Sequence, residues 1–251
     1  CQLPDLVQMY IATFGVWEPD VTAFIRSSLG SGDVCVDIGA NIGWCAVAAA
    51  DAVGDEGRVV AVEASPSMAA ELRENIRRSG HEGRVRVAEC AASAERGTLT
   101  IYSGPTHNRG LATTVAGRGF SAECEVPALP LVEILEPDEL SRVRLIKIDV
   151  EGGEFAVLEG VAKSIGELPD DVEILVELSP RWWPESAPEP AEALRPFMDA
   201  GFNLYMIPNN YWPWRYLWPR DVARPIRLRD SIDRKIRRID LVLSRKDQEH
   251  L

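Results

Sequence analysis

Apolar residues recur every three or four positions over residues 1–30, a spacing that places side chains on one face of a helix. After a break at Gly30-Ser31-Gly32, short β-branched runs alternate with helical stretches. The expected order is strand 33–38, helix 42–53, strand 58–63, helix 65–79 and strand 84–90. This alternation predicts an α/β fold with a parallel sheet and crossover helices, preceded by a helical cap over residues 1–30.

The rest of the chain continues the alternation less regularly. Residues 97–102 predict an added strand, and the polar, Gly-rich residues 104–120 predict a loop. The expected elements after them are strand 143–149, a helix from about Gly153, strand 172–178, helix 191–200, strand 203–207 and strand 239–244. Residues 208–238 separate the last two strands, and a connection of that length is either functional or conceals an unrecognised element.

Composition limits the class of protein. The 251 residues are 46% hydrophobic and 26% charged, which is typical of a globular chain, and we interpret residues 1–251 as one domain. The net charge of −12 argues against a nucleic-acid binder, because such proteins need a basic face. We find no apolar run long enough to span a membrane and no signal-peptide pattern, so we expect no membrane association and a cytoplasmic location.

The most informative stretch is VDIGANIG at residues 36–43. Asp37 ends a buried strand, and Gly39, Asn41 and Gly43 lead into a helix. Glycines allow a ligand to approach the backbone closely, and the helix start offers free N–H groups. The G-x-G-x-x-G pattern of dinucleotide-binding proteins is absent, whereas an acid–x–Gly–x–x–x–Gly turn resembles the first motif of class I methyltransferases, which bind S-adenosylmethionine.

Three further strand ends carry candidate site residues. Glu63 ends the second strand, where a carboxylate can accept both hydroxyls of a ribose. Cys90 and Ala91 lie at the end of the third strand, where an adenine could lie on small side chains. Asp149 ends the strand expected beside the first one, at the topological switch point where ligands bind. A single acid at a strand end is more often a solvated terminus, but three successive strand ends with suitable residues favour a site.

The specific resemblance lies in four sequence motifs: VDIGANIG, AVEASPSMAAELREN, GTLTIY and LIKIDVEGGEFAVLEG. In this order and spacing they resemble the FkbM family of methyltransferases. The resemblance implies a Rossmann-like class I fold with a mostly parallel seven-stranded sheet, helices on both faces and S-adenosylmethionine as cofactor. It further implies O-methylation of a hydroxyl on a sugar, polyketide or other secondary metabolite.

Carried onto this sequence, the resemblance assigns the cofactor-binding residues. Asp37, Gly39, Asn41 and Gly43 would line the methionine side, Glu63 with Ala64 would hold the ribose, Cys90 and Ala91 would lie near the adenine, and Asp149 would face the reacting end. The sequence departs from the family pattern at Leu131-Val132, where family members often have Leu-Asp, and at His81, where they often have Asn. The first departure puts in doubt a role for an acid before the fourth strand.

Methyl transfer to an alcohol needs a group that removes the hydroxyl proton. We expect His81 to be exposed and His250 to lie in the tail, which leaves His107 as the histidine placed near an acceptor, unless it is a loop residue without a role. Asp149 and Glu177 would end adjacent strands, so either could take part in catalysis. Together they could also hold Mg²⁺ through oxygen ligands, although two acids do not make a coordination sphere and we do not favour a metal.

The segment from Trp182 to Arg238 is rich in Trp and Arg. Its aromatic rings could line an acceptor pocket, with residues 208–238 as a lid, or they could form a satellite core. Residues 220–238 carry eight basic and three acidic side chains, which suits a solvated helix, a contact between copies in a homo-oligomer, or a clamp for an anionic carrier.

The sequence therefore predicts an S-adenosylmethionine-dependent O-methyltransferase that acts on a small-molecule acceptor. Two alternatives stay open: a nicotinamide-dependent oxidoreductase, and a non-catalytic scaffold that binds an adenosyl ligand.

Overall fold

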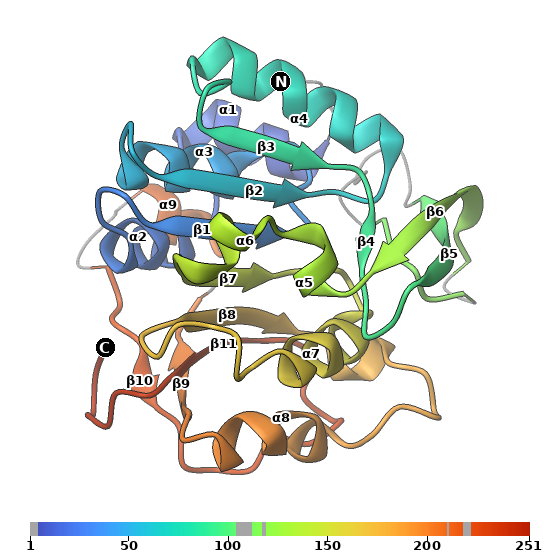
Figure 1. Ribbon diagram of the computed structural model, residues 1–251, viewed down its shortest axis with the longest axis vertical. Helices are drawn as coiled ribbons and strands as arrows, with labels where there is room; N and C mark the ends of the chain where they lie inside the picture. The colour runs from blue at the N-terminus through green and yellow to red at the C-terminus, as the bar shows by residue number, and fades with distance from the viewer. Residues whose placement is uncertain (1–4, 104–111, 117–118, 210, 218–221) are drawn as a thin grey trace.

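The computed structural model describes residues 5–103, 112–116, 119–209, 211–217 and 222–251 (Figure 1). Its centre is an eight-stranded sheet with the order β10-β9-β11-β8-β7-β1-β2-β3. The strands are β1 (Val34–Ile38), β2 (Arg58–Val62), β3 (Val85–Ala88), β7 (Val143–Ile148), β8 (Glu173–Leu178), β9 (Asn203–Ile207), β10 (Ile226–Arg227) and β11 (Ile239–Ser244). β1, β2, β3, β7 and β8 pair in parallel, and β11 runs antiparallel to both of its neighbours.

This order is that of the class I methyltransferase fold, with β1 and β7 as the central neighbours. The expected count of seven strands is wrong by one, because the short strand β10 pairs with the edge strand β9. β10 lies inside the segment 208–238 and is only two residues long, so its hydrophobic pattern carries no strand signal. The other seven strands correspond to segments predicted from the sequence.

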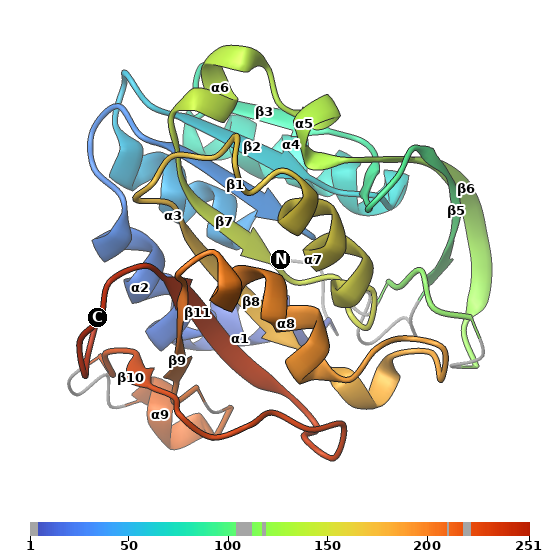
Figure 2. The same cartoon turned by 60° about the horizontal axis from the view of Figure 1, so that its bottom comes forward.

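Helices cover both faces of the sheet, as expected (Figures 1 and 2). They are α1 (Leu6–Phe14), α2 (Pro19–Ser28), α3 (Trp44–Val53), α4 (Pro66–Ser79), α5 (Leu131–Ile134), α6 (Pro137–Ser141), α7 (Glu154–Lys163), α8 (Pro190–Asp199) and α9 (Pro213–Leu217), with a 3₁₀ turn at Pro180–Trp182. Alternate residues of β1 enter separate cores: Val36 and Ile38 pack under α7 and α8, and Cys35 packs under α2 and α3.

The local sequence explains where the key helices begin and end. Ser65 precedes α4 and its hydroxyl accepts the N–H of Met68, while Pro66 occupies the first turn. Gly80 ends α4 in the left-handed conformation, with φ of 76°. The helix after β2 therefore starts immediately beyond Glu63, which fixes that carboxylate at the carboxyl edge of the sheet.

A second, three-stranded sheet has the order β4-β6-β5 and stands beside the carboxyl edge of the main sheet (Figure 1). It consists of β4 (Ala91–Ala92), β5 (Gly97–Ser103) and β6 (Ser121–Leu129). β5 is the added strand expected at 97–102. β6 escapes a sequence-based prediction because most of its residues are exposed or half-buried, so no apolar face marks it.

The N-terminal helices contact the segment that follows β9. Asp20 is fully buried, pairs with Arg215 and accepts the backbone N–H of Ala223 at 2.9 Å. The Tyr10 hydroxyl donates to the carbonyl of Tyr211 at 3.1 Å, and its ring packs against Tyr216. The helices expected near the N-terminus are therefore present as α1 and α2, and these contacts tie them to the 208–238 segment.

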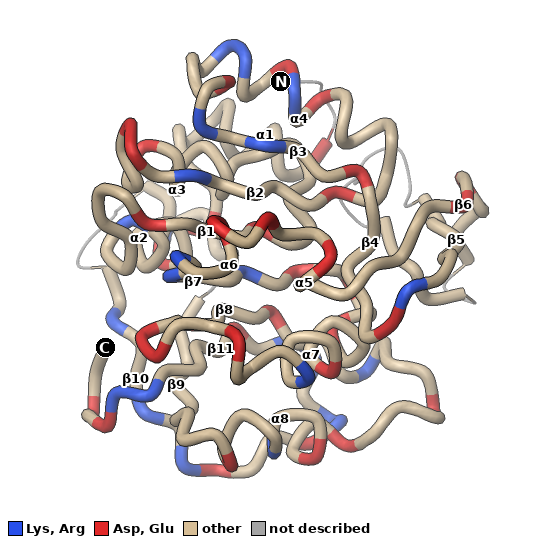
Figure 3. The backbone as a smooth tube through the Cα atoms, in the orientation of Figure 1, with Lys and Arg blue, Asp and Glu red and all other residues tan. Residues whose placement is uncertain are grey.

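Charged residues of both signs are interspersed along the backbone (Figure 3). Four arginines of the basic segment pair with acids elsewhere in the chain: Arg227 with Asp247, Arg229 with Glu249, Arg234 with Glu189 and Arg238 with Glu177. This pairing weakens the interpretation of the segment as a clamp for an anion. Within the residues described, no helix is both long enough and apolar enough to cross a membrane.

Candidate active site

A cavity of about 720 Å³ opens at the carboxyl ends of β1, β2, β7 and β8. Eight of the candidate residues line it, from these four strand ends and from the segment after β3: Gly39, Asn41, Glu63, Ala64, Cys90, Ala91, Asp149 and Glu177. They come together because parallel strands end at the same edge of a sheet. Asp37 and Gly43 are not among the residues that line the cavity.

The turn after β1 is held in an unusual backbone conformation. Gly39 has φ of 79°, and a Cβ atom there would lie 1.8 Å from the carbonyl oxygen of Asp149. Asn41 also has a positive φ, of 51°, although it is not a glycine. Gly43 serves the packing of helices, because a Cβ atom there would lie 2.5 Å from Cδ1 of Leu72. The turn therefore brings β1 and the residue after β7 into direct contact.

Glu63 is oriented by two backbone donors. Its Oε2 accepts the N–H of Asn41 and its Oε1 accepts the N–H of Ser65, both at 2.8 Å. Burial raises the pKa of Glu63 to about 7, and the two hydrogen bonds oppose that rise. Each carboxylate oxygen keeps a lone pair that could accept a further hydroxyl group.

The region beyond Glu63 is small and apolar. Ala64, Cys90 and Ala91 line it together with Leu99 and Ile101 of the second sheet. A flat aromatic base could lie with its ring faces against such side chains. The second sheet thus forms one wall of the cavity, a role that the sequence did not reveal.

Lys147 is a site residue that sequence reasoning missed. Its ammonium lies 3.2 Å from Asp37 Oδ1 and 3.3 Å from Asp149 Oδ2, and the residue is only 6% exposed. Lys147 is also the strand partner of Asp37 in the β1–β7 register. Burial by itself lowers the pKa of Lys147, but the two carboxylates together raise it well above its usual value. Asp149 is therefore held from two directions, through its backbone by Gly39 and through its side chain by Lys147.

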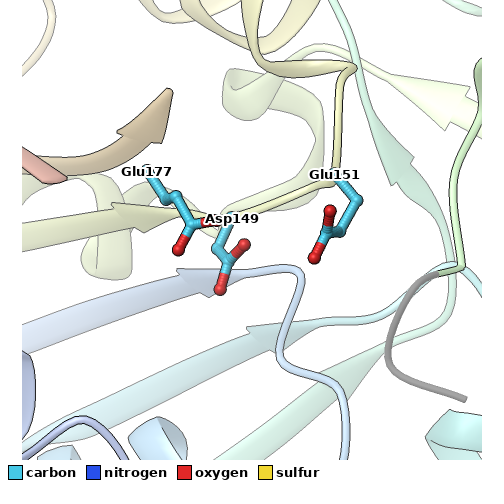
Figure 4. A group of neighbouring side chains, drawn as sticks. All are labelled: Asp149, Glu151 and Glu177. Atoms are coloured by element: carbon cyan, nitrogen blue, oxygen red, sulfur yellow. The ribbon is translucent and has the colours of Figure 1, made fainter. Parts of the chain in front are cut away.

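Three carboxylates converge in the cavity where β7 and β8 end (Figure 4). Asp149, Glu151 and Glu177 each offer an oxygen that lies within 4.8 Å of the others. Oxygen ligands at this spacing could hold a divalent cation such as Mg²⁺. Glu177 also pairs with Arg238 at 3.5 Å, and burial together with the charge of Asp149 raises the pKa of Glu177 well above its usual value.

Another part of the cavity lining comes from residues distant in sequence. Tyr10 of α1, and Trp17 and Glu18 between α1 and α2, line the cavity together with Tyr211 and Arg238. The guanidinium of Arg238 stacks over the ring of Tyr211 at 3.9 Å. No sequence motif marks these residues, because their proximity depends on how distant segments pack.

The histidines and tryptophans divide between several environments. His107 lies outside the described residues, and so does Trp218. The expectation that His81 is exposed is wrong, since it is 8% exposed and pairs with Asp51 at 3.0 Å. Trp182 lines the cavity, Trp183 is buried in the core, and Trp212 and Trp214 are exposed. Trp182 and Trp183 are thus adjacent in sequence but lie in the cavity wall and in the main core, and the prediction of an acceptor pocket stays a prediction.

The fold and the strand-end cavity define a class I methyltransferase, and a family comparison makes this more specific. Residues 37–204 match the model of the "Methyltransferase FkbM domain". The chain belongs to the FkbM methyltransferase family and is an S-adenosylmethionine-dependent methyltransferase.

The individual proteins that match this chain have low sequence identity to it. A curated relative, the methyltransferase sdnD of Sordaria araneosa, is 27% identical over 206 residues, which cover 71% of this chain and 76% of the relative. Among solved structures, an S-adenosylmethionine-dependent O-methyltransferase from Thermotoga maritima gives a TM-score of 0.49 at 14% identity, covering 98% of this chain and 73% of that one. Fibrillarin from Aeropyrum pernix with bound S-adenosylmethionine gives 0.48 at 14% identity, covering 91% and 76%.

Proposed function

We propose that this methyltransferase methylates a hydroxyl group on a sugar, polyketide or other secondary metabolite. The observation that carries the proposal is the composition of the cavity beyond Asp149, where carboxylates face aromatic rings. Carboxylates accept hydrogen bonds from hydroxyl groups, and the rings of Trp17, Trp182 and Tyr211 offer flat apolar surface to a sugar or polyketide ring.

The residues present fit S-adenosylmethionine. Glu63 would accept its ribose hydroxyls, and Ala64, Cys90 and Ala91 would contact its adenine. The turn at Gly39 and Asn41 would receive the methionine portion, because both residues line the cavity next to Glu63. We propose Asp37 and Gly43 as indirect contributors, which shape this turn without lining the cavity. The bound cofactor supplies an electrophilic methyl group on a positively charged sulfur.

The chain's own residues then have three tasks. Asp149 orients the reacting groups, since its backbone and side chain are both fixed and its carboxylate faces the cavity. Glu177 and Glu151 lie beside it and bind the acceptor. The N-terminal helices and the 208–238 segment together exclude water, which gives that segment the role of a lid. His107 stays a candidate for proton transfer.

The acceptor is expected to be a small molecule and not a nucleic acid. The carboxylates of Asp149, Glu151 and Glu177 give the reacting end a negative character that repels phosphate groups. We do not assign a metal to these residues, because Arg238 already pairs with Glu177.

The proposal is tested by incubating the protein with S-adenosylmethionine labelled in the methyl group and a panel of hydroxyl-bearing glycosides and polyketides. We expect label to appear in an acceptor as an ether, identified by mass spectrometry. Transfer only to nitrogen, carbon or RNA would contradict the proposal. Binding of the cofactor without any transfer would instead favour a non-catalytic scaffold.

A further inference from the structure

Glu18 is a cavity-lining acid outside the region that matches the family model. It lies between α1 and α2, directly before Pro19, and is only 4% exposed. The family match begins at residue 37, so the motifs of the family assign Glu18 no role.

The backbone at Glu18 is strained. Its φ of 43° and ψ of 69° place it in the left-handed region, which costs a side-chain-bearing residue free energy. The described non-glycine residues with positive φ are Glu18, Asn41 and Glu151, and all three line the cavity. Strain of this kind persists where surrounding contacts enforce it, and it concentrates at functional sites.

The contacts that enforce this position leave one carboxylate oxygen available. The Tyr211 hydroxyl donates to Oε1 of Glu18, and Asn209 Nδ2 lies 3.5 Å from the same oxygen. Among the described residues, Oε2 of Glu18 has no hydrogen-bond partner. Glu18 is thus fixed by one oxygen and can receive a proton on the other.

Two neighbouring acids are already engaged by cations. Asp149 Oδ2 lies 3.3 Å from the Lys147 ammonium and Glu177 Oε2 lies 3.5 Å from the Arg238 guanidinium, so a proton taken up by either carboxylate would compete with an ion pair. Within the described part of the chain, Glu18 has no cation at ion-pair distance, and both of its donors are neutral.

We propose that Glu18 is the general base that removes the proton from the acceptor hydroxyl. The proton passes to Oε2 of Glu18 as the acceptor oxygen forms its bond to the methyl carbon, and the electron pair of the broken carbon–sulfur bond stays on sulfur. The protonated Glu18 then returns its proton to solvent. This inference rests on the proposed transfer to a hydroxyl group.

The charges around Glu18 are consistent with this role. Burial raises the pKa of Glu18 to about 7, the carboxylates of Asp240 and Asp149 add to the rise, and Tyr211 and Arg238 oppose it. Glu177 is a further acid in this group, since it interacts electrostatically with Glu18. A base whose pKa lies near neutral pH combines a useful ionised fraction with a high proton affinity.

The first test asks whether Glu18 lies close to the methyl group of the cofactor, and it needs no acceptor. Protein labelled with ¹³C at glutamate side-chain carboxyls is titrated by NMR in the presence of S-adenosylmethionine and, separately, of S-adenosylhomocysteine, with Glu18→Gln used to assign the signal. The two compounds differ by the methyl group and its positive charge. If Glu18 faces that methyl group, the charge should lower its pKa by about one to two units.

Glu154 is the matched control. It is also buried, and burial likewise raises its pKa to about 7, but its oxygens accept Gly152 N–H and Trp183 Nε1–H and it does not line the cavity. Its pKa should differ between the two complexes by less than about half a unit. A shift of Glu18 no larger than that of Glu154 would overturn the proposal.

A second measurement tests the chemical step. With an acceptor found in the panel, Glu18→Gln should lose at least about 100-fold in turnover, with S-adenosylhomocysteine affinity within about threefold of wild type. Tyr211→Phe keeps Glu18 but removes the hydrogen bond that lowers its pKa, so the pH at which turnover is half-maximal should rise. Wild-type turnover in Glu18→Gln would refute the base and leave the methyltransferase assignment intact, whereas a wild-type protein that binds neither compound would refute both.

Discussion

The two ends of the cavity are built in different ways. At the cofactor end, Glu63 is held by backbone groups of Asn41 and Ser65, which lie within 22 residues of it in the chain. At the acceptor end, Glu18 is held by Tyr211, which lies 193 residues away. One end is encoded by short motifs at strand termini, and the other by packing between segments on either side of the family-matched region.

This difference follows the boundaries of the match to the family model. The residues proposed to bind the cofactor lie within residues 37–204, as do Asp149 and Glu177. Tyr10, Trp17, Glu18, Tyr211 and Arg238 lie outside that range and line the proposed acceptor end. We therefore expect changes at the proposed cofactor end to affect binding of any adenosyl ligand, and changes at the proposed acceptor end to affect acceptors selectively.

Asp149 lies where the two ends meet, so its substitution should have the largest effect. Asp149→Asn should lower turnover at least about 100-fold, because reacting groups lose their orientation, while the melting temperature stays near that of wild type. Steady-state kinetics and calorimetry check both. Asp55→Asn, an exposed surface change, serves as the control. A folded Asp149→Asn protein with normal methyl transfer would show that Asp149 does not orient the reacting groups.

Glu63 tests the cofactor end alone. Glu63→Ala removes hydrogen bonds to a charged group and should weaken S-adenosylmethionine binding by about 10- to 150-fold in titration calorimetry. The variant should still methylate the same acceptor when the cofactor is saturating. Unchanged cofactor affinity would show that the ribose does not lie at Glu63.

The pH dependence of binding should sharpen this assignment. Because the pKa of Glu63 is about 7, a falling pH protonates a carboxylate that must accept ribose hydroxyls. Affinity should therefore decrease below pH 7, approaching about tenfold per pH unit, and level off above pH 8. Glu63→Gln should lack this dependence. The same slope in both proteins would assign the titration to another group.

The smallest expected effect is that of removing metal ions, which tests whether Asp149, Glu151 and Glu177 hold a cation. We expect EDTA to change turnover by less than about twofold, because Lys147 and Arg238 already compensate Asp149 and Glu177. The measurement compares initial rates with and without the chelator. Loss of turnover that added Mg²⁺ restores would instead show that the three carboxylates hold a metal.

The cofactor end could be predicted because each of its signals is local. A buried strand followed by an acid or a glycine places that residue at the carboxyl edge of the sheet whatever the rest of the chain does. Lys147 could have been found by the same reasoning, since a lysine within the buried strand VRLIKI requires an acidic partner. The sequence carried that signal, but it was not recognised.

The acceptor end could not be predicted in this way. Glu18 and Tyr211 have no shared spacing, and their contact depends on the docking of α1 and α2 against the segment after β9. β6 and β10 were not predicted for related reasons, because β6 is largely exposed and β10 has only two residues. Hydrophobic periodicity reports burial against a local core, and none of these features depends on such a core.

The contact between Glu18 and Tyr211 also has a consequence for folding. Contacts between residues far apart in sequence form late, because closing a long loop costs entropy that only the finished structure repays. During synthesis, Asp149 and Glu63 leave the ribosome well before Tyr211 and Arg238. The nascent chain should therefore acquire the surface proposed to bind the adenosyl cofactor first, and become competent for chemistry only when its last strands have been added.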